Sequence, residues 1–233
     1  MRLDLSRVLQ DTLRHLQAHP SGHIAFGLVA TVVLQACGMG LGLGGSAAVW
    51  LGSLATMVFG PAGLLGIVVG GAFFVLGFAA LMWLTSAAFM AYQKATLDEV
   101  DGRGDVALGT LRGALLGSVG LLCALSLVQC GLGLAGLCLC YVGIFVTSVP
   151  FRFAWLLAVE RQLGLADALA AAWTAFWEAP ADHLISYGLM MLVMMTLGSV
   201  PLVGLLVAWP FFAVAEAFTF RQLFPRGADA PLP

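Results

Sequence analysis

The sequence predicts an all-α, polytopic membrane protein, and both its composition and the distribution of its charges indicate this class. Hydrophobic residues make up 61% of the 233 positions and charged residues only 9%, whereas soluble domains carry about 25% charged residues. No Asp, Glu, Lys or Arg occurs between Arg14 and Lys94, or between Arg112 and Arg152. Each stretch far exceeds the roughly 20 apolar residues that cross a bilayer, so each must contain at least one helical hairpin.

Six transmembrane helices, arranged as three in–out–in hairpins, fit the hydropathy of the chain. The three outer connections, at about 45–61, 130–133 and 199, contain no Lys or Arg. The positive-inside rule therefore predicts that both termini are cytoplasmic. We expect a single transmembrane domain over 1–224 and a short cytoplasmic tail over 225–233. The predicted spans are 24–44, 62–92, 113–129, 134–158, 181–198 and 200–221.

Two amphipathic helices are predicted at the inner membrane interface, one at the N-terminus over 1–22 and one before the fifth span over 164–179. In each, apolar residues recur at the spacing of one helix face. A Pro-x-x-His motif follows each of these apolar stripes. The proline ends the amphipathic helix and a span begins there. Because both segments share this pattern, we interpret them as an internal repeat. The stripes are Leu5, Leu9, Leu13 and Leu16, followed by Pro20 and His23, and Leu165, Leu169, Trp173 and Phe176, followed by Pro180 and His183.

The glycine-rich stretch after the first span has two interpretations. Residues 45–60 could form an outer interfacial helix anchored by Trp50, or a re-entrant loop that lines a cavity. The second span is better defined, because Pro61 is a favourable residue to start a helix and the helix can continue to Val100. At 1.5 Å per residue its length is roughly 60 Å, about twice the hydrocarbon thickness, so we expect it to tilt or to project into the cytoplasm.

The last third of the chain carries a family resemblance. Its motifs are Ala158-Val159-Glu160-Arg161, Leu163-Gly164-Leu165-Ala166-Asp167-Ala168-Leu169, Pro210-Phe211 and Phe220-Arg221-Gln222-Leu223-Phe224. From Pro150 to Phe224 the chain resembles the YciC-like group of bacterial inner-membrane proteins and the membrane domain attached to some glycerophosphodiester phosphodiesterases. The resemblance implies a helical fold in the bacterial cytoplasmic membrane. It implies no activity, because the predicted spans leave no room for the phosphodiesterase domain.

Two charged residues inside spans and a set of glycines are the candidate functional positions. An unpaired charge in the membrane costs at least about 2–3 kcal/mol on insertion scales. We therefore predict that Arg152 and Glu216 form an ion pair or share a water-filled cavity; independent snorkelling to the interface is the alternative. Small residues at four-residue spacing let helix backbones approach closely, within one subunit or between two. The predicted packing positions are Gly66, Gly70, Gly109, Gly113 and Gly117.

The sequence indicates no catalytic, cofactor or metal site. The four histidines fall in or beside interfacial segments without an acidic partner nearby, so we expect them to face lipid headgroups. Ser186, His183 and Asp182 lie within five residues, but neighbours on one helix do not face each other, and we expect no enzyme. A net charge of −2 gives no basic surface for nucleic acid. The histidines are His15, His19, His23 and His183.

Two functions are consistent with this sequence. The first is a non-enzymatic membrane protein that assembles with copies of itself into a channel, a transporter or a membrane-shaping assembly, since repeated hairpins are common in transporters. The second is a scaffold or anchor subunit for a cytoplasmic or membrane partner, since the polar segments are predicted on the inner side. Both functions place the chain in the bacterial cytoplasmic membrane in contact with lipid.

Overall fold

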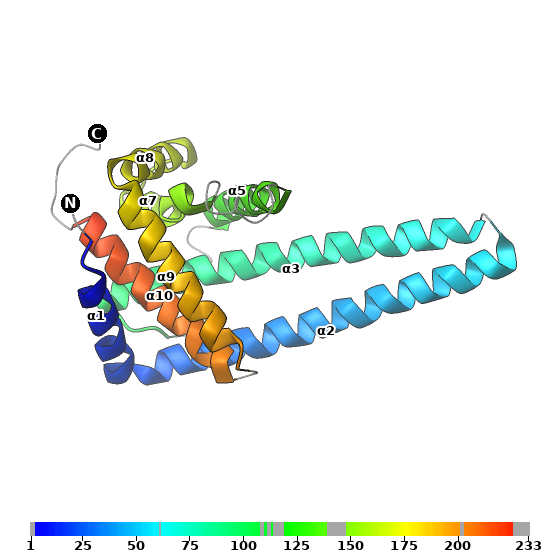
Figure 1. Ribbon diagram of the computed structural model, residues 1–233, viewed down its shortest axis with the longest axis horizontal. Coiled ribbons are helices and arrows are strands. Elements are labelled where there is room, and N and C mark those ends of the chain that lie inside the picture. Colours follow the sequence, from blue (N-terminus) through cyan, green and yellow to red (C-terminus); the bar gives the residue numbers. More distant parts are fainter. Residues whose placement is uncertain are drawn as a thin grey trace. The chain divides into compact units, whose positions relative to one another are not determined.

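The described part of the chain is helical, which confirms the all-α class. No strand occurs among the described residues, which form two compact units (Figure 1). We call Val29–Ser86 the hairpin, and Met1–Leu28 together with Ala87–Pro233 the body. The computed structural model of the chain describes residues 3–60, 62–107, 110, 113, 119–138, 148–200 and 203–225.

The hairpin is formed by parts of two long helices, α2 (Pro20–Phe59) and α3 (Ala62–Val100). The chain turns between them at Gly60, whose φ of +61° is a left-handed conformation that glycine adopts without strain. The two arms pack closely at Gly52, where an added Cβ atom would lie only 2.7 Å from Cγ1 of Ile67. Glycine therefore permits the close approach of the two helices.

The course of α2 corrects the interpretation of residues 45–60. Residues 45–59 form neither a re-entrant loop nor a separate helix, because α2 is one continuous helix of 40 residues that ends at Phe59. Glycine keeps its backbone N–H, and no proline occurs between Pro20 and Pro61 to interrupt the hydrogen bonds. In lipid, a continuous helix also satisfies every backbone polar group internally. By contrast, α3 covers 39 residues and ends at Val100, as the sequence predicts.

The body contains the shorter helices. The predicted amphipathic segments form α1 (Leu5–Ala18) and α8 (Leu165–Glu178). The predicted fifth and sixth spans correspond in position to α9 (Pro180–Gly198) and α10 (Val203–Leu223). The other described elements are α5 (Val119–Cys138), a 3-10 turn at Val149–Phe151 and α7 (Ala154–Glu160).

Two boundaries predicted in the middle of the chain are wrong. Helix α5 continues through residues 130–133, the position predicted for an outer turn, because Gly131 in a helix costs only about 1 kcal/mol. The predicted fourth span, 134–158, is not one straight helix, since a 3-10 turn containing Pro150 precedes α7. Proline has no N–H to donate and breaks the regular pattern there. Residues 139–147 lie outside the described part of the chain.

The core of the body lies where α7, α8 and α10 meet the end of α3. Leu156, Leu157 and Phe220 are fully buried there. Trp155 of α7 donates a hydrogen bond of 2.7 Å from Nε1 to the carbonyl oxygen of Met90 in α3. Helices α1 and α9 each pack against α10. The N-terminal helix and the C-terminal helices therefore belong to one packed unit.

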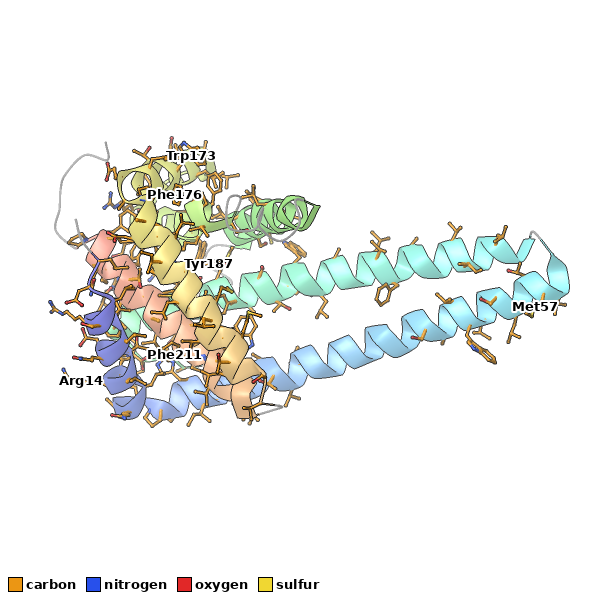
Figure 2. The ribbon with its side chains drawn as sticks, viewed as in Figure 1. Arg14, Met57, Trp173, Phe176, Tyr187 and Phe211 are labelled. Carbon is orange, nitrogen blue, oxygen red and sulfur yellow. The ribbon has the colours of Figure 1, made fainter. Side chains whose placement is uncertain are left out.

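The surface of the hairpin is apolar along its length. Met57, near its tip, is 85% exposed (Figure 2), and Trp50 and Leu76 are also exposed. The hydroxyls of Ser53 and Thr56 donate to carbonyl oxygens of their own helix, so they need no solvent partner. In the part of the chain that the structure describes, two helical segments are long and apolar enough to cross a membrane. They are Gly66–Val100 and Pro180–Leu197.

Candidate functional site

The structure brings together the two charges that the sequence places inside spans. Nη1 of Arg152 lies 3.4 Å from Oε1 of Glu216, and both side chains are buried. Arg152 directly follows the 3-10 turn, and Glu216 lies within α10. Removing two charges from water is costly, but opposite charges at this distance offset part of that cost.

Further contacts hold the guanidinium group of Arg152. Its Nη2 donates a hydrogen bond of 2.7 Å to Oγ of Ser186 in α9, and its Cζ lies 4.3 Å from the ring centre of Phe153. Ser186 itself donates to the carbonyl oxygen of His183. Nε and Nη1 of Arg152 and both carboxylate oxygens of Glu216 make no hydrogen bond to the described protein atoms. Within the described residues, the contact between the two side chains is therefore an ion pair without a hydrogen bond.

A small recess adjoins Arg152. Its volume is about 20 Å³, which is room for about one water molecule. Gln93 and Arg152 supply polar groups to its wall, and Trp155 and Phe151 are among its aromatic lining residues. A species the size of a water molecule in this recess would therefore lie next to Arg152.

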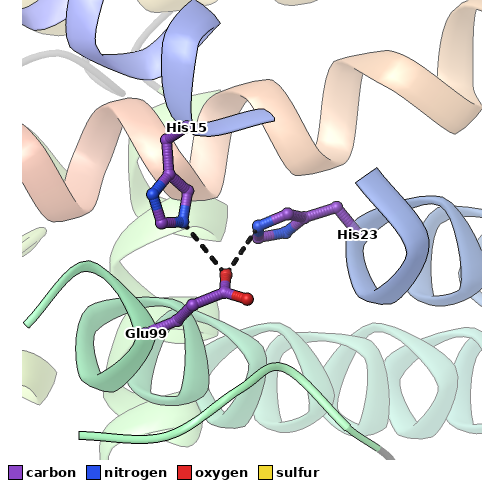
Figure 3. A group of neighbouring side chains, drawn as sticks. All are labelled: His15, His23 and Glu99. Carbon is purple, nitrogen blue, oxygen red and sulfur yellow. Dashed lines mark hydrogen bonds and ion pairs between the residues drawn. The ribbon is translucent and has the colours of Figure 1, made fainter. Parts of the chain in front are cut away.

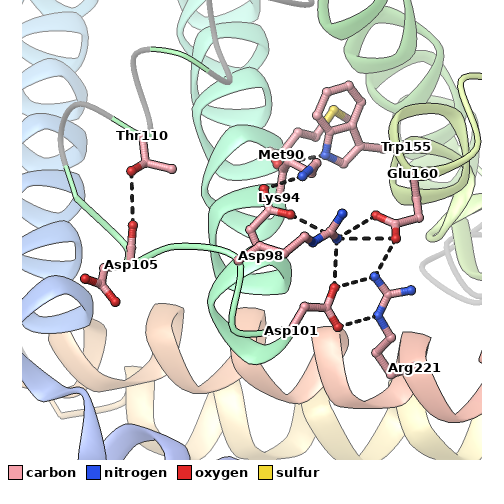
Figure 4. Close-up of polar contacts among 10 residues, drawn as sticks. Met90, Lys94, Asp98, Asp101, Asp105, Thr110, Trp155, Glu160 and Arg221 are labelled. Carbon is pink, nitrogen blue, oxygen red and sulfur yellow. Dashed lines mark hydrogen bonds and ion pairs between the residues drawn. The ribbon is translucent and has the colours of Figure 1, made fainter. Parts of the chain in front are cut away.

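A network of ion pairs joins the end of α3 to α7 and α10. Nη2 of Arg221 lies 2.7 Å from Oε1 of Glu160 and also pairs with Asp101, while Nη2 of Arg103 lies 2.9 Å from Oε2 of Glu160 (Figure 4). Burial would raise the pKa of Glu160, but the hydrogen bonds and charges of the two arginines outweigh it and lower that pKa below its usual value. The network therefore favours the charged carboxylate and links three helices.

A second cluster joins histidines to a buried carboxylate. Oε2 of Glu99 lies 3.0 Å from Nε2 of His15 and 2.8 Å from Nε2 of His23 (Figure 3). Nδ1 of His19 is farther away, 3.9 Å from Oε1 of the same carboxylate. The expectation that the histidines face lipid headgroups is wrong for His23 and His183, which are buried.

The bend between α1 and α2 creates this cluster. Helix α1 ends at Ala18 and α2 begins at Pro20, so His15 and His23 approach from the two sides of the bend, with ring centres 5.7 Å apart. Glu99 is 84 residues from His15, and no local spacing rule connects residues so far apart. The available sequence signal was the four-residue spacing of the histidines, which continues across the proline.

The glycines predicted to pack helices occupy different environments. A Cβ atom added to Gly66 would lie 3.6 Å from Cα of Gly52, so this position belongs to the packing within the hairpin. A Cβ atom added to Gly113 would meet nothing within 4 Å, and Gly70 lies in α3 and is partly exposed. Gly109 and Gly117 lie outside the described residues.

The chain matches no protein-family model, no curated protein and no solved structure. The class that the structure itself defines is an all-helical protein with an uncharged apolar hairpin, candidate membrane-crossing helices and buried ionisable clusters in its body.

Proposed function

We propose that the chain is a non-enzymatic, multi-pass membrane protein that allows a small ion or solute to pass at the Arg152–Glu216 pair. The observation that carries this proposal is the pair itself: both charges are buried, and both keep polar atoms without a protein hydrogen bond. Ionisable residues inside membrane proteins usually face the bundle interior and mark paths for ions or substrates. The adjoining recess gives Arg152 room for a small polar species.

The apolar hairpin supports a membrane environment. Soluble proteins rarely expose contiguous apolar patches larger than a few hundred Å², whereas the hairpin exposes large apolar side chains on both arms, such as Leu51 and Val58 on α2 and Val68 and Leu76 on α3. Lipid would cover these side chains without cost. Six spans in the bacterial cytoplasmic membrane, with both termini inside, are part of the proposal, and the YciC-like resemblance supports this location. The third and fourth spans are then not divided at 130–133, because α5 continues through these residues.

A face of α2 supports assembly with further copies of the chain. Gly40 and Gly44 lie one helical turn apart, and a Cβ atom added to either would meet no described atom within 4 Å. Two small residues at this spacing let a second membrane helix approach closely. Gly52, in contrast, already serves the packing within the hairpin. We therefore place the contact with a second copy at Gly40 and Gly44.

A scaffold or anchor role is the second candidate, and one observation favours it. Besides pairing with Glu216, Arg152 donates to Ser186 and stacks on Phe153, which is the pattern of a clamp between helices. In that role the pair would stabilise the body, and a cytoplasmic or membrane partner would bind the inner segments.

Conductance in planar bilayers and solute flux in proteoliposomes test the proposal directly. Arg152→Met and Glu216→Gln should each reduce flux by about tenfold or more, since the passing species would lose its charged contact. Each single change should also destabilise the protein by roughly 3–5 kcal/mol, because it leaves one buried charge unpaired. The double replacement should cost less than the sum of the two single losses.

The thermal stability of each variant in detergent separates the two roles. Glu178→Gln, on the exposed end of α8, is the matched control and should change neither flux nor melting. If wild-type protein of the correct mass conducts nothing, the transport proposal fails and the scaffold role replaces it. Gly40→Leu and Gly44→Leu should reduce the mass of the detergent-solubilised assembly, and an unchanged mass would contradict assembly through this face.

A further inference from the structure

The His15, His23 and Glu99 cluster has the composition and geometry of a metal site. One ligand atom from each residue lies within 4.8 Å of the other two. The metal–ligand bonds of Zn²⁺ are about 2.0–2.2 Å, which separates neighbouring ligand atoms by roughly 3–3.5 Å. The N–O distances of 3.0 Å and 2.8 Å are close to that range. A small outward shift of the side chains would therefore make room for an ion.

The imidazole of His23 is oriented for metal binding. Its Nδ1 lies 2.6 Å from the hydroxyl oxygen of Tyr92, while its Nε2 makes no hydrogen bond although a Glu99 oxygen is 2.8 Å away. When Nδ1 donates its proton to Tyr92, Nε2 presents a lone pair toward the carboxylate. In this tautomer, a cation bound by both Nε2 and the Glu99 carboxylate would satisfy the two groups. The residue is only 1% exposed, so bulk solvent does not satisfy them.

We propose that His15, His23 and Glu99 bind one divalent transition-metal ion, with Zn²⁺ as the best fit. Two imidazoles and one carboxylate are a known ligand set for zinc with an open fourth position, and imidazole nitrogens disfavour Mg²⁺ and Ca²⁺. His19 lies next to the site, with its ring centre 5.0 Å from that of His15. Its side chain is half exposed, so an ion can enter the site from solvent past this residue. Once the ion is bound, the His19 imidazole can serve as the fourth ligand.

The bound ion would join three separate helices. His15 belongs to α1, His23 to the first turns of α2 and Glu99 to the last turn of α3. The backbone N–H of Val106 approaches Oε1 of Glu99 at 3.4 Å, which leaves Oε2 for the metal. The ion would therefore fix the N-terminal helix to the ends of α2 and α3. This role is independent of passage at Arg152 and Glu216.

Metal binding to the purified full-length chain tests the inference. The protein, carrying an affinity tag without histidine, is stripped with chelator in detergent and titrated with ZnCl₂ by calorimetry. We expect one Zn²⁺ per chain, a higher melting temperature that chelator reverses, and tetrahedral absorption bands when Co²⁺ replaces Zn²⁺. His15→Ala and Glu99→Gln should each weaken Zn²⁺ binding by on the order of 100-fold. Tyr92→Phe should weaken it by about 10–100-fold, because the hydrogen bond that orients His23 is lost.

The controls separate this site from adventitious binding. Tyr92→Phe keeps the aromatic stacking of residue 92 on Phe26, whose ring centre is 3.6 Å away, so folding should be preserved. His183→Gln removes a buried histidine outside the site and should leave Zn²⁺ affinity unchanged. Wild-type protein that takes up no Zn²⁺, or takes it up without tetrahedral Co²⁺ bands, would show that the cluster is only hydrogen-bonded. Equal affinity in His15→Ala and wild type would also overturn the assignment.

Discussion

The hairpin and the body differ in their content of ionisable residues. All 10 Lys and Arg, all 12 Asp and Glu and all four His belong to the body, and the hairpin, Val29–Ser86, contains none of them. The hairpin exposes large apolar side chains such as Met57, whereas the body buries charged ones such as Glu216. The ionisable side chains of the chain, buried ones such as Glu216 included, are therefore confined to the body.

The difference shows how each unit satisfies its polar atoms. In the hairpin, hydroxyl groups such as those of Thr56 and Thr85 donate to carbonyls one turn earlier in the same helix, so no partner from another helix is needed. In the body, side chains from different helices satisfy one another, as Arg221 and Glu160 do. The first arrangement suits a segment surrounded by lipid, and the second holds helices in fixed positions and builds sites.

Among changes that compare the hairpin with the body, a charge placed on the hairpin should have the largest effect. Leu76→Arg puts a guanidinium on an apolar, 70% exposed position of α3 and should cost about 2.5–3.5 kcal/mol on insertion scales if this position lies near the bilayer centre. The same change at Leu13 of α1, also well exposed, should cost less, because an interfacial arginine can reach water. The fraction inserted into membranes, measured by carbonate extraction and protease protection, compares the two. Equal losses would mean that the two units share one environment.

Packing within the hairpin gives the next largest effect. A Cβ atom on Gly52 would lie 2.9 Å from the backbone nitrogen of Ile67, so Gly52→Ala should force the arms apart and cost about 1–3 kcal/mol. At Gly71 nothing lies within 4 Å, and Gly71→Ala should be neutral or slightly stabilising. Thermal melting in detergent measures both variants. A stable Gly52→Ala variant would contradict the close contact of the arms.

Local signals predicted much of the fold. The start of α9 follows from Pro180, and the end of α3 follows from the charged turn that begins at Asp101. Two predictions are wrong in glycine-rich sequence: residues 45–59 continue α2 instead of forming a separate element, and α5 continues through 130–133, where a turn was expected. Glycine-rich sequence in lipid is compatible with both a turn and a helix. The helix is favoured because lipid offers no water to hydrogen-bond the backbone N–H and C=O groups, so these groups must pair with one another.

The two buried clusters differ in how much the sequence reveals. Arg152 and Glu216 were predictable as candidates, because a charge within a long apolar stretch is conspicuous and costly. The contact of His15 and His23 with Glu99 was not, because it depends on the bend at Pro20 and on the three-dimensional position of the end of α3. Long-range contacts of this kind leave no spacing in the sequence.

Acid should weaken the body more than the hairpin. The pKa of Glu160 is lowered in the folded protein, so its stabilising effect is present above the unfolded pKa of about 4.3 and is lost as the pH falls through the folded value. Because the network is partly exposed, the loss should be about 1 kcal/mol or less. The melting temperature of the wild-type protein should fall more steeply toward low pH than the melting temperature of Glu160→Gln. Parallel pH profiles would mean that the network does not stabilise the folded body.

The smallest expected effect concerns the backbone at the end of α7. Gln162 has a φ of +53°, the left-handed conformation that is unfavourable for residues with a Cβ atom. The N–H of Leu163 donates a hydrogen bond of 2.9 Å to the carbonyl oxygen of Ala158, which closes the helix end around this residue. Gln162→Gly should remove roughly 1 kcal/mol of strain but add entropy to the unfolded chain, for a net stabilisation of about 0.5 kcal/mol. Gln162→Ala keeps the strain and should leave melting unchanged, since the side chain is exposed. No gain from glycine, or a loss larger than that of alanine, would show that the glutamine side chain contributes to the body, and the strain argument would fail.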